Sequence, residues 1–310
     1  MDPIILFFIL GIILGISKAE VRLPGQVYEF VTMLLLITIG LKGGIELAKQ
    51  PFVSLLPKIS LVLAVGIILP IFAYPVLKII GKFKREDAAS IAAHYGSVSV
   101  GTFAVTLAYL NTKGIPFEEY MALFVVILEI PAILVGIILA RGVSKQTNWK
   151  QVTHEVLLGK GVVLLVGGLL VGWLAGPSGV EPIAPLFFDL FKGILALFLL
   201  EMGLVTAVQL SSLKTYGLFL ILFGVIMPIF SGVLGIITGQ LMGLSVGGIT
   251  VMATLTASAS YIAVPAAMRI SVPEANPTLS LAASLGITFP FNVLAGIPLY
   301  YFFAEKFTIA

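Results

Sequence analysis

The chain contains no cysteine in 310 residues and only two histidines, His94 and His154. Without cysteine there can be no disulfide, thiolate nucleophile or thiolate metal site, and two imidazoles are too few for a His-based metal cluster. Charge is also scarce, because 11% of the residues are charged where a soluble domain typically has about a quarter. We therefore expect no soluble catalytic domain, no metal site other than one for sodium, discussed below, and no nucleic-acid binding.

Apolar residues are abundant instead. They make up 59% of the chain, and the mean hydropathy is +1.13. A helix needs about 20 residues to cross about 30 Å of hydrocarbon, so the sequence predicts an all-α integral membrane protein in the lipid bilayer. Its apolar runs predict ten transmembrane helices, near residues 3–17, 27–48, 55–80, 87–110, 119–141, 156–175, 185–210, 215–240, 245–268 and 278–303.

The distribution of basic residues predicts how these spans are oriented. With the N-terminus outside, 12 of the 18 Lys and Arg residues fall on the cytoplasmic side and 5 outside, and Lys42 lies within a span. Basic loops stay in the cytoplasm. We therefore expect a multi-pass protein of the plasma (inner) membrane with both termini outside, whose first span is retained because Asp2 replaces the basic residue that a signal peptide needs.

The two halves of the sequence resemble each other. ILGIILG at 9–15 is similar to VGGLLVG at 166–172, ITIGLKGGIEL at 37–47 to LEMGLVTAVQL at 200–210, and GSVS at 96–99 to ASAS at 257–260. EIPAILVG at 129–136 is similar to TFPFNVLAG at 288–296. Each half holds five spans, an odd number, so the second half enters the membrane upside down. This predicts a 5+5 inverted repeat, residues 1–150 and 151–310, as in secondary transporters.

Polar residues interrupt the fourth and ninth spans at equivalent places. Pro265 removes a helical hydrogen bond, which predicts that the ninth span opens around residues 260–264. Backbone groups freed in this way are tolerated in a membrane only where they line a cavity or are buried in protein. Amides at a helix start suit a small anion, and carbonyl and hydroxyl oxygens suit sodium. The alternative is that these hydroxyls only bond back to helical carbonyls or let helices pack closely. The polar residues concerned are Gly96, Ser97, Ser99, Gly101 and Thr102 in the fourth span, and Thr256, Ser258 and Ser260 in the ninth.

Acidic residues within predicted spans are candidates for function, because burying them in lipid is costly. Glu129 is the stronger candidate, since Pro131 predicts a helix break beside it. Glu201 could equally be a hydrogen-bonded packing residue. Lys42 and Glu46 are four residues apart in the second span, and we interpret them as a pair that neutralises itself.

Two further polar residues have simple structural interpretations. His94 precedes the first break and could titrate, although a single histidine in a helix is more often a satisfied polar group. Arg269 ends the ninth span at the predicted cytoplasmic surface, where topology or lipid headgroups would explain it.

Several short motifs, in this order, resemble those of the SbtA-type sodium-dependent bicarbonate transporters. The likeness covers nearly the whole chain. The matching residues are Gly96, Val98, Ser99 and Thr102; Glu129, Ile130, Pro131 and Ala132; Ala257, Ser258, Ser260, Pro265 and Arg269; and Pro273, Ala275, Asn276 and Pro277.

This resemblance implies a ten-span symporter with two crossed discontinuous helices, spans 4 and 9, that forms a homo-oligomer, a trimer, and moves bicarbonate inward on the sodium gradient. It implies no enzymatic activity and no cofactor besides Na⁺ as coupling ion. The anion site would consist of Gly96, Ser97, Val98, Ser99, Ala257, Ser258, Ala259 and Ser260, and the sodium site of Thr102, Glu129, Ser260 and Tyr261.

Two departures from the family pattern leave alternatives open. The cyanobacterial members have an aspartate where this chain has Tyr261, so the cargo could be another small anion or carboxylate, with sodium or with proton coupling through Glu129. Those members are also regulated by a PII-like partner and carry a long charged loop between spans five and six. The connection here is short, so whether such a regulator binds this chain stays open. An intramembrane enzyme is disfavoured because no span pairs a nucleophile with a base; a non-transporting sensor with the same fold stays open.

Overall fold

The computed structural model describes residues 2–142, 149–212 and 217–307, and within these ranges it contains helices and no strands. Eight helical segments are long and apolar enough to cross a membrane, and two shorter apolar helices, Pro3–Ile16 and Val246–Ala257, lie where the first and ninth spans are predicted. The eight segments are Gly25–Leu47, Val53–Ile80, Arg85–Thr112, Glu119–Arg141, Lys160–Ile183, Phe191–Leu210, Gly217–Leu241 and Pro277–Phe307.

The helices follow the apolar runs of the sequence. In the first half they are α1 (Pro3–Ile16), α2 (Gly25–Leu47), α3 (Phe52–Pro75) continued by a π-helical turn (Val76–Ile80), α4 (Arg85–Gly96), α5 (Val100–Thr112), α6 (Ala122–Arg141, preceded by a 3₁₀ turn at Glu119–Met121) and α7 (Trp149–Leu157).

The second half continues in the same way. Its helices are α8 (Lys160–Val180, followed by turns at Glu181–Ile183 and Pro185–Asp189), α9 (Phe191–Ser212), α10 (Gly217–Leu241), α11 (Val246–Ala257), α12 (Ala263–Ser271), α13 (Pro277–Ala283), α14 (Phe289–Phe291) and α15 (Ile297–Phe307), with π-helical turns at Ser284–Thr288 and Asn292–Gly296.

Two helix pairs are interlocked through small residues. Between α1 and α9, a methyl group on Gly11 would collide with the carbonyl oxygen of Leu200 and lie 3.0 Å from the Cα of Gly203. Between α2 and α8, a methyl group on Gly40 would lie 2.5 Å from the carbonyl oxygen of Leu165 and 2.8 Å from the Cα of Gly168. Small residues allow such close backbone contact, which drives helix association in lipid, where the hydrophobic effect between helices is absent.

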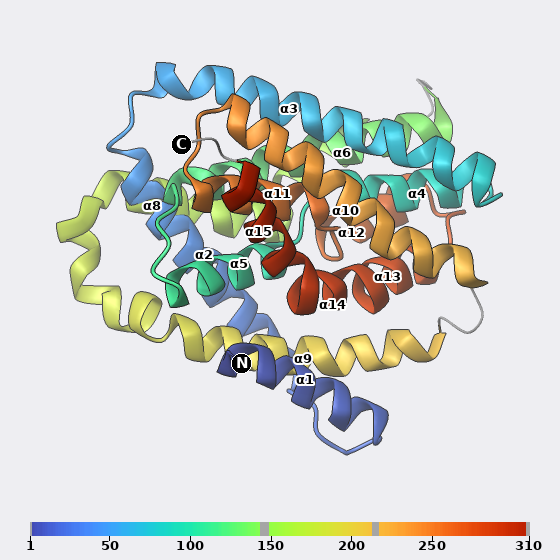
Figure 1. The fold of residues 1–310 in the computed structure, drawn as a ribbon, viewed down its shortest axis with the longest axis horizontal. Coiled ribbons are helices and arrows are strands. Elements are labelled where there is room, and N and C mark those ends of the chain that lie inside the picture. Colours follow the sequence, from blue (N-terminus) through green and yellow to red (C-terminus); the bar gives the residue numbers. More distant parts are fainter. Residues whose placement is uncertain (1, 143–148, 213–216, 308–310) are drawn as a thin grey trace.

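The other long helices form a second group. Helices α3, α4 and α6 pack on one another, and α10 packs on α11, which also contacts α15. Figure 1 shows α1 and α9 side by side along one edge of the molecule, with α3 and α6 along the opposite edge. The discontinuous segments α4–α5 and α11–α12 lie between these edges, where they are protected from lipid.

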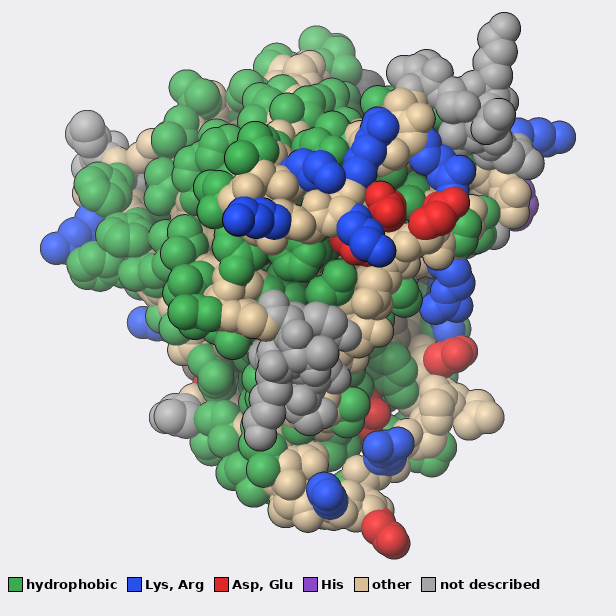
Figure 2. Space-filling view, turned by 90° about the vertical axis from the view of Figure 1, so that its right-hand side faces the viewer, with side chains coloured by type: hydrophobic (Ala, Val, Ile, Leu, Met, Phe, Trp, Pro, Cys, Tyr) green, Lys and Arg blue, Asp and Glu red, His purple; other side chains and the backbone are tan. Residues whose placement is uncertain are grey.

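The surface is largely apolar, with basic residues gathered at one end. Figure 2 views the end at which α3 meets α4 in Figure 1 and shows a group of Lys and Arg side chains there beside extensive apolar surface. The connection at this end exposes Lys82, Lys84 and Arg85. An apolar belt next to a basic end is typical of a membrane protein, and the positive-inside rule predicts that this end faces the cytoplasm.

The sixth span begins a few residues later than the predicted start near residue 156. Residues 149–157 form the separate helix α7, and the membrane-length helix begins only at Lys160, after Gly159. Val152 and Val156 of α7 are buried against Val264 and Met268 of α12. The amphipathic α7 thus covers the second discontinuous helix and does not begin a span.

Candidate functional site

Both predicted interruptions are present in the structure. The first opens the chain at residues 97–99, between α4 and α5, and the second at residues 258–262, between α11 and α12. The residue that ends the first helix is extended in each case: Ser97 has φ −93° and ψ −174°, and Ser258 has φ −84° and ψ 167°. Repeat-equivalent serines therefore end equivalent helices with the same backbone conformation.

The second break lies slightly earlier than predicted. The sequence predicts opening at residues 260–264, with Pro265 as the cause, whereas the helix is already open at Ser258 and resumes at Ala263. Pro265 is the third residue of α12, where an amide would have no intrahelical acceptor in any case. Pro265 therefore helps to start α12.

The first break is fixed by hydroxyl groups from both halves of the chain. The Ser99 amide donates a hydrogen bond of 2.9 Å to Ser258 Oγ, whose hydroxyl donates to the Leu255 carbonyl at 2.8 Å. Ser99 Oγ caps α5 by accepting from the Thr102 amide at 3.0 Å and from the Thr102 hydroxyl at 2.9 Å. These bonds join the two breaks directly and satisfy polar groups that lipid could not.

The second break is held differently. The Ser260 amide donates to the His94 carbonyl at 2.9 Å, and Ser260 Oγ accepts from the Val264 amide at only 3.4 Å. The Ala257 carbonyl, which ends α11, accepts from Asn292 Nδ2 at 2.8 Å. Backbone and amide groups thus hold this break, and the Ser260 hydroxyl is only weakly engaged.

A small cavity of about 30 Å³ lies where the two breaks meet. A space of this size can hold a few water-sized groups. Five of the predicted site residues line it: Val98, Ser99, Glu129, Ser260 and Tyr261. The remaining lining residues are Thr32, Leu35, Leu36, Val100, Gly101, Gly161, Phe198 and Ile262.

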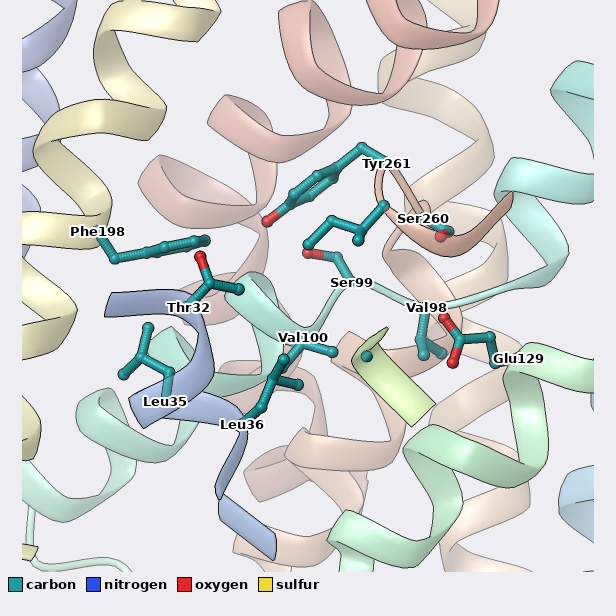
Figure 3. A pocket seen from close by; sticks show the side chains of 13 residues that line it. Thr32, Leu35, Leu36, Val98, Ser99, Val100, Glu129, Phe198, Ser260 and Tyr261 are labelled. Atoms are coloured by element: carbon teal, nitrogen blue, oxygen red, sulfur yellow. The ribbon is translucent and has the colours of Figure 1, made fainter. Parts of the chain in front are cut away.

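Polar groups converge on this cavity from several helices. Figure 3 shows the hydroxyls of Thr32, Ser99 and Tyr261 directed toward one another, and the Glu129 carboxylate beside Val98 on the other side. The Tyr261 hydroxyl is buried close to Ser99 and the Gly101 backbone, makes no hydrogen bond of good geometry with the described residues, and would collide with a methyl group on Gly101. The cavity therefore offers oxygen atoms that are not fully used within the protein.

The charge distribution suits a cation next to an anion. Glu129 is the only ionisable carboxylate that lines the cavity and is 7% exposed, and none of the ion pairs between described residues includes it. The first amides of α5, at Val100 and Gly101, have no intrahelical acceptor, and a helix N-terminus carries about half a positive charge. Carboxylate and hydroxyl oxygens are the ligands that hard cations prefer.

The other predicted site residues lie around the cavity and do not line it. Ser97 is buried, and its Oγ has no partner among the described residues. Gly96 lies against Pro70, whose Cδ would be 2.5 Å from a methyl group at that position. Thr102, Ala257, Ser258 and Ala259 are buried next to the breaks and act through the contacts that shape them.

Sequence reasoning missed two residues that line the cavity, Thr32 and Phe198. Thr32 donates its hydroxyl to the Tyr28 carbonyl at 2.8 Å, and Phe198 stacks on Tyr28 with ring centroids 5.9 Å apart. Thr32 is one of two threonines in the second span, which was a weak signal. Nothing in the sequence distinguishes Phe198 from the lipid-facing aromatics.

The other ionisable candidates lie away from the cavity. Glu201 accepts a 3.1 Å hydrogen bond from the Leu23 amide, so it fastens the α1–α2 connection. Glu46 pairs with Lys49 at 2.8 Å and not with Lys42 as predicted. The Lys42 ammonium instead lies 5.3 Å from the centroid of the Phe188 ring.

Pro131 does not break α6, contrary to the sequence prediction. Helix α6 is continuous from Ala122 to Arg141, and Pro131 packs so tightly against α3 that its Cγ would lie 2.8 Å from a methyl group on Gly66. Glu129 is therefore presented by a regular helix.

Comparison with known proteins decides the family. The model of the Na⁺-dependent bicarbonate transporter superfamily matches residues 3–305. The chain belongs to this superfamily. Among curated proteins, no sequence matches it significantly. Superfamily membership and the apolar helices identify a multi-pass membrane transporter of the sodium-dependent bicarbonate class, and by this family assignment the protein is not an enzyme.

Proposed function

We propose that the protein is a symporter that moves bicarbonate into the cell together with sodium, and that both ions bind at the cavity between the two breaks, which has to widen from its present volume of about 30 Å³ to admit them. The observation that carries this proposal is the convergence of Ser99, Ser260, Tyr261 and Glu129 on one enclosed space. A cation and an anion bound together leave little net charge to bury, which lowers the cost of taking either out of water.

The two ions would occupy different sides of the cavity. Bicarbonate would bind the amides that start α5 and the hydroxyls of Ser99 and Ser260, with Ser97 and Ser258 shaping the breaks. Sodium would bind near the Glu129 carboxylate, with oxygens from Ser260 and the breaks, and the Tyr261 hydroxyl, which lies on the Ser99 side, would contribute where the two ions meet. Thr102 would affect the binding of both ions, because its hydroxyl donates to Ser99 Oγ and fixes the orientation of that hydroxyl.

The glycine contacts support the proposed 5+5 inverted repeat. In this repeat of residues 1–150 and 151–310, α1 corresponds to α8 and α2 corresponds to α9. The α1–α9 pair therefore corresponds to the α8–α2 pair, and glycines interlock both pairs. The cavity lies between these pairs and the second helix group, since Thr32 and Phe198 come from the first and Ser99 and Glu129 from the second. Movement of one group against the other would alternate access to the cavity, as in other inverted-repeat transporters.

The cellular setting is proposed from the same family relationship. The protein would reside in the plasma membrane with both termini outside and would assemble as a homo-oligomer, a trimer by resemblance. A PII-like regulator would have to recognise a surface other than a long loop between α6 and α8, because that connection is short and contains α7.

Uptake by proteoliposomes tests the proposed function. Labelled bicarbonate is supplied outside under an inward sodium gradient, then with potassium in place of sodium, and then with acetate as competitor. We expect uptake that requires sodium and is insensitive to acetate. Uptake that is unchanged in potassium would contradict sodium coupling.

A second candidate is a proton-coupled transporter of another small carboxylate. Two observations favour it: the cavity contains a single carboxylate, Glu129, and a neutral phenol at Tyr261. Uptake of acetate driven by a pH gradient and indifferent to sodium would favour this candidate.

A further inference from the structure

A second cavity, of about 100 Å³, lies on the other side of the second break. It is enclosed by α4, by α12 and by the segment that leads to α13, which lie together in the right-hand half of Figure 1. Its lining residues are Ser90, His94, Pro265, Met268, Arg269, Val272, Pro273, Ala275 and Pro277. The space exceeds that of the first cavity and is ample for an ion of four heavy atoms, since one water needs about 10–15 Å³.

One ring nitrogen of His94, which lines this cavity, has no hydrogen-bond partner among the described residues. The residue is 1% exposed, and its Nδ1 lies 2.7 Å from the Ser90 carbonyl. A carbonyl can only accept, so Nδ1 carries the proton, and in the neutral ring Nε2 is an acceptor. This Nε2 is buried and has no partner among the described residues. A ligand that fits here must therefore supply a donor.

Arg269 supplies positive charge at the same cavity. Its side chain lines the space and is also exposed, so the cavity has a charged wall at the end of α12. The nearby acids are engaged elsewhere: Glu274 binds Arg141 at 2.7 Å, and Asp87 accepts from the Asn276 amide at 2.7 Å. These two contacts fix the segment 272–277 at Glu274 and at Asn276.

We propose that this cavity is a second binding site for the transported anion, on the side from which bicarbonate leaves. Its chemistry selects an oxyanion that also carries an O–H group. The O–H donates to His94 Nε2, and the negatively charged oxygens bind the Arg269 guanidinium. Bicarbonate and dihydrogen phosphate have this combination, whereas nitrate lacks the donor. The identity of bicarbonate as the occupant rests on the proposed function.

The position fits an exit site next to the central one. The Ser260 amide, which belongs to the second break, is bonded to the carbonyl of His94 itself. A change in the break therefore reaches the His94 backbone directly. An anion released from Ser99 and Ser260 would find the next unoccupied hydrogen-bonding group on the far side of this bond.

Equilibrium binding of labelled bicarbonate to the purified full-length protein in detergent tests the proposal, at a pH where bicarbonate predominates and with sodium present. We expect His94→Phe and Arg269→Gln each to abolish about half of the binding seen in the wild type, or to raise the Kd of that half at least about tenfold. His94→Gln keeps an acceptor and should retain part of it. Lys84→Gln removes an exposed charge at the same end of the molecule and should change nothing.

Competition identifies the chemistry of the occupant. Unlabelled bicarbonate should displace the His94-dependent half, and nitrate should not. Displacement by inorganic phosphate at equal concentration would show a general site for O–H-bearing oxyanions and would overturn the assignment to the transported anion.

The result separates the inference from the proposed function. If Ser99→Ala and Ser260→Ala abolish all binding and the His94 and Arg269 variants bind like the wild type, the second site does not exist and the central site stands. If the His94 and Arg269 variants lose binding while the serine variants keep it all, the central assignment fails and the second site stands. If His94→Phe does not fold, Arg269→Gln decides whether the second site exists, because the exposed Arg269 side chain can be changed without disturbing the core.

Discussion

The two breaks carry nearly the same sequence, GSVS and ASAS, yet they are held by different bonds. At the first, the Ser99 amide is bonded to Ser258 Oγ, and Ser99 Oγ accepts two hydrogen bonds from Thr102, so that only its O–H is left to donate. At the second, the Ser260 amide is bonded to a backbone carbonyl, and the Ser260 hydroxyl makes one long contact of 3.4 Å. The first break thus combines structural and binding roles, whereas the second leaves its hydroxyl free for a ligand.

The same contrast extends to the helices beside the breaks. Asn292 in the second half uses both ends of its amide, since Nδ2 donates to the Ala257 carbonyl and Oδ1 accepts from the Tyr300 hydroxyl at 2.9 Å. Glu129 lies in the matching motif of the first half, close to the position that corresponds to Asn292. It lines the cavity without an ion-pair partner among the described residues. In the inverted repeat that we propose, the second half would thus use this position for stability and the first half for binding.

The largest effect is expected from Glu129→Gln. Removing the charge that would hold sodium should lower sodium-driven bicarbonate uptake by about a hundredfold or more, since loss of one partner of a buried ion pair costs about 3–5 kcal/mol. Asn292→Ala is the matched change and should lower the thermal unfolding midpoint in detergent while sodium dependence persists. Full sodium-driven uptake by Glu129→Gln would remove Glu129 from the cation site.

The next largest effect separates Ser99 from Ser260. Ser99→Ala should lower uptake at least about tenfold and also destabilise the protein by about 1 kcal/mol, because it deletes the cap of α5. Ser260→Ala should lower uptake similarly with little change in stability. The measurements are initial uptake rates and thermal unfolding in detergent, with the exposed Ser60→Ala as control. Equal loss of stability in both variants would erase the distinction between the breaks.

A smaller effect on uptake, measured mainly as a change in stability, distinguishes Ser258 from Ser97, the matching serine of the first motif. Ser258→Ala leaves the buried Ser99 amide without an acceptor, which should cost about 1–3 kcal/mol. Ser97→Ala removes a buried hydroxyl that has no partner and should be neutral or slightly stabilising. Comparing the free energies of unfolding of the two variants tests this directly, and a larger loss in Ser97→Ala would contradict the observed hydrogen bonding.

The smallest effect concerns Tyr261. Tyr261→Phe deletes a hydroxyl that makes no hydrogen bond of good geometry with the described residues, so stability should change little. If the phenol supplies an oxygen to sodium, the sodium concentration for half-maximal uptake should rise a few-fold while the maximal rate is kept, an effect of about 1 kcal/mol. An unchanged sodium requirement would exclude Tyr261 as a ligand.

Much of the candidate site could be predicted because polar residues stand out in an apolar sequence. Ser99, Ser260 and Glu129 were identifiable because hydroxyls and acids within spans are costly in lipid. Thr32 and Phe198 were not, because they reach the cavity only through the packing of α2 and α9 against the breaks. The predicted effect of Pro131 was wrong, because Pro131 packs against α3 within a continuous α6. The break predicted before Pro265 is present but begins two residues earlier, and Pro265 lies in the first turn of α12.

The sequence by itself determined the membrane class, the position of the helices and the two interruptions, because lipid penalises every polar residue that the chain places within a span. Only the tertiary structure decided which hydroxyl bonds to which amide. Ser97 and Ser258 are equivalent in sequence, but the amide that each could accept lies on another helix, and only the packing of those helices brought one of them within reach. The same packing joined His94 and Arg269 around a second cavity, where the sequence indicated two unrelated residues.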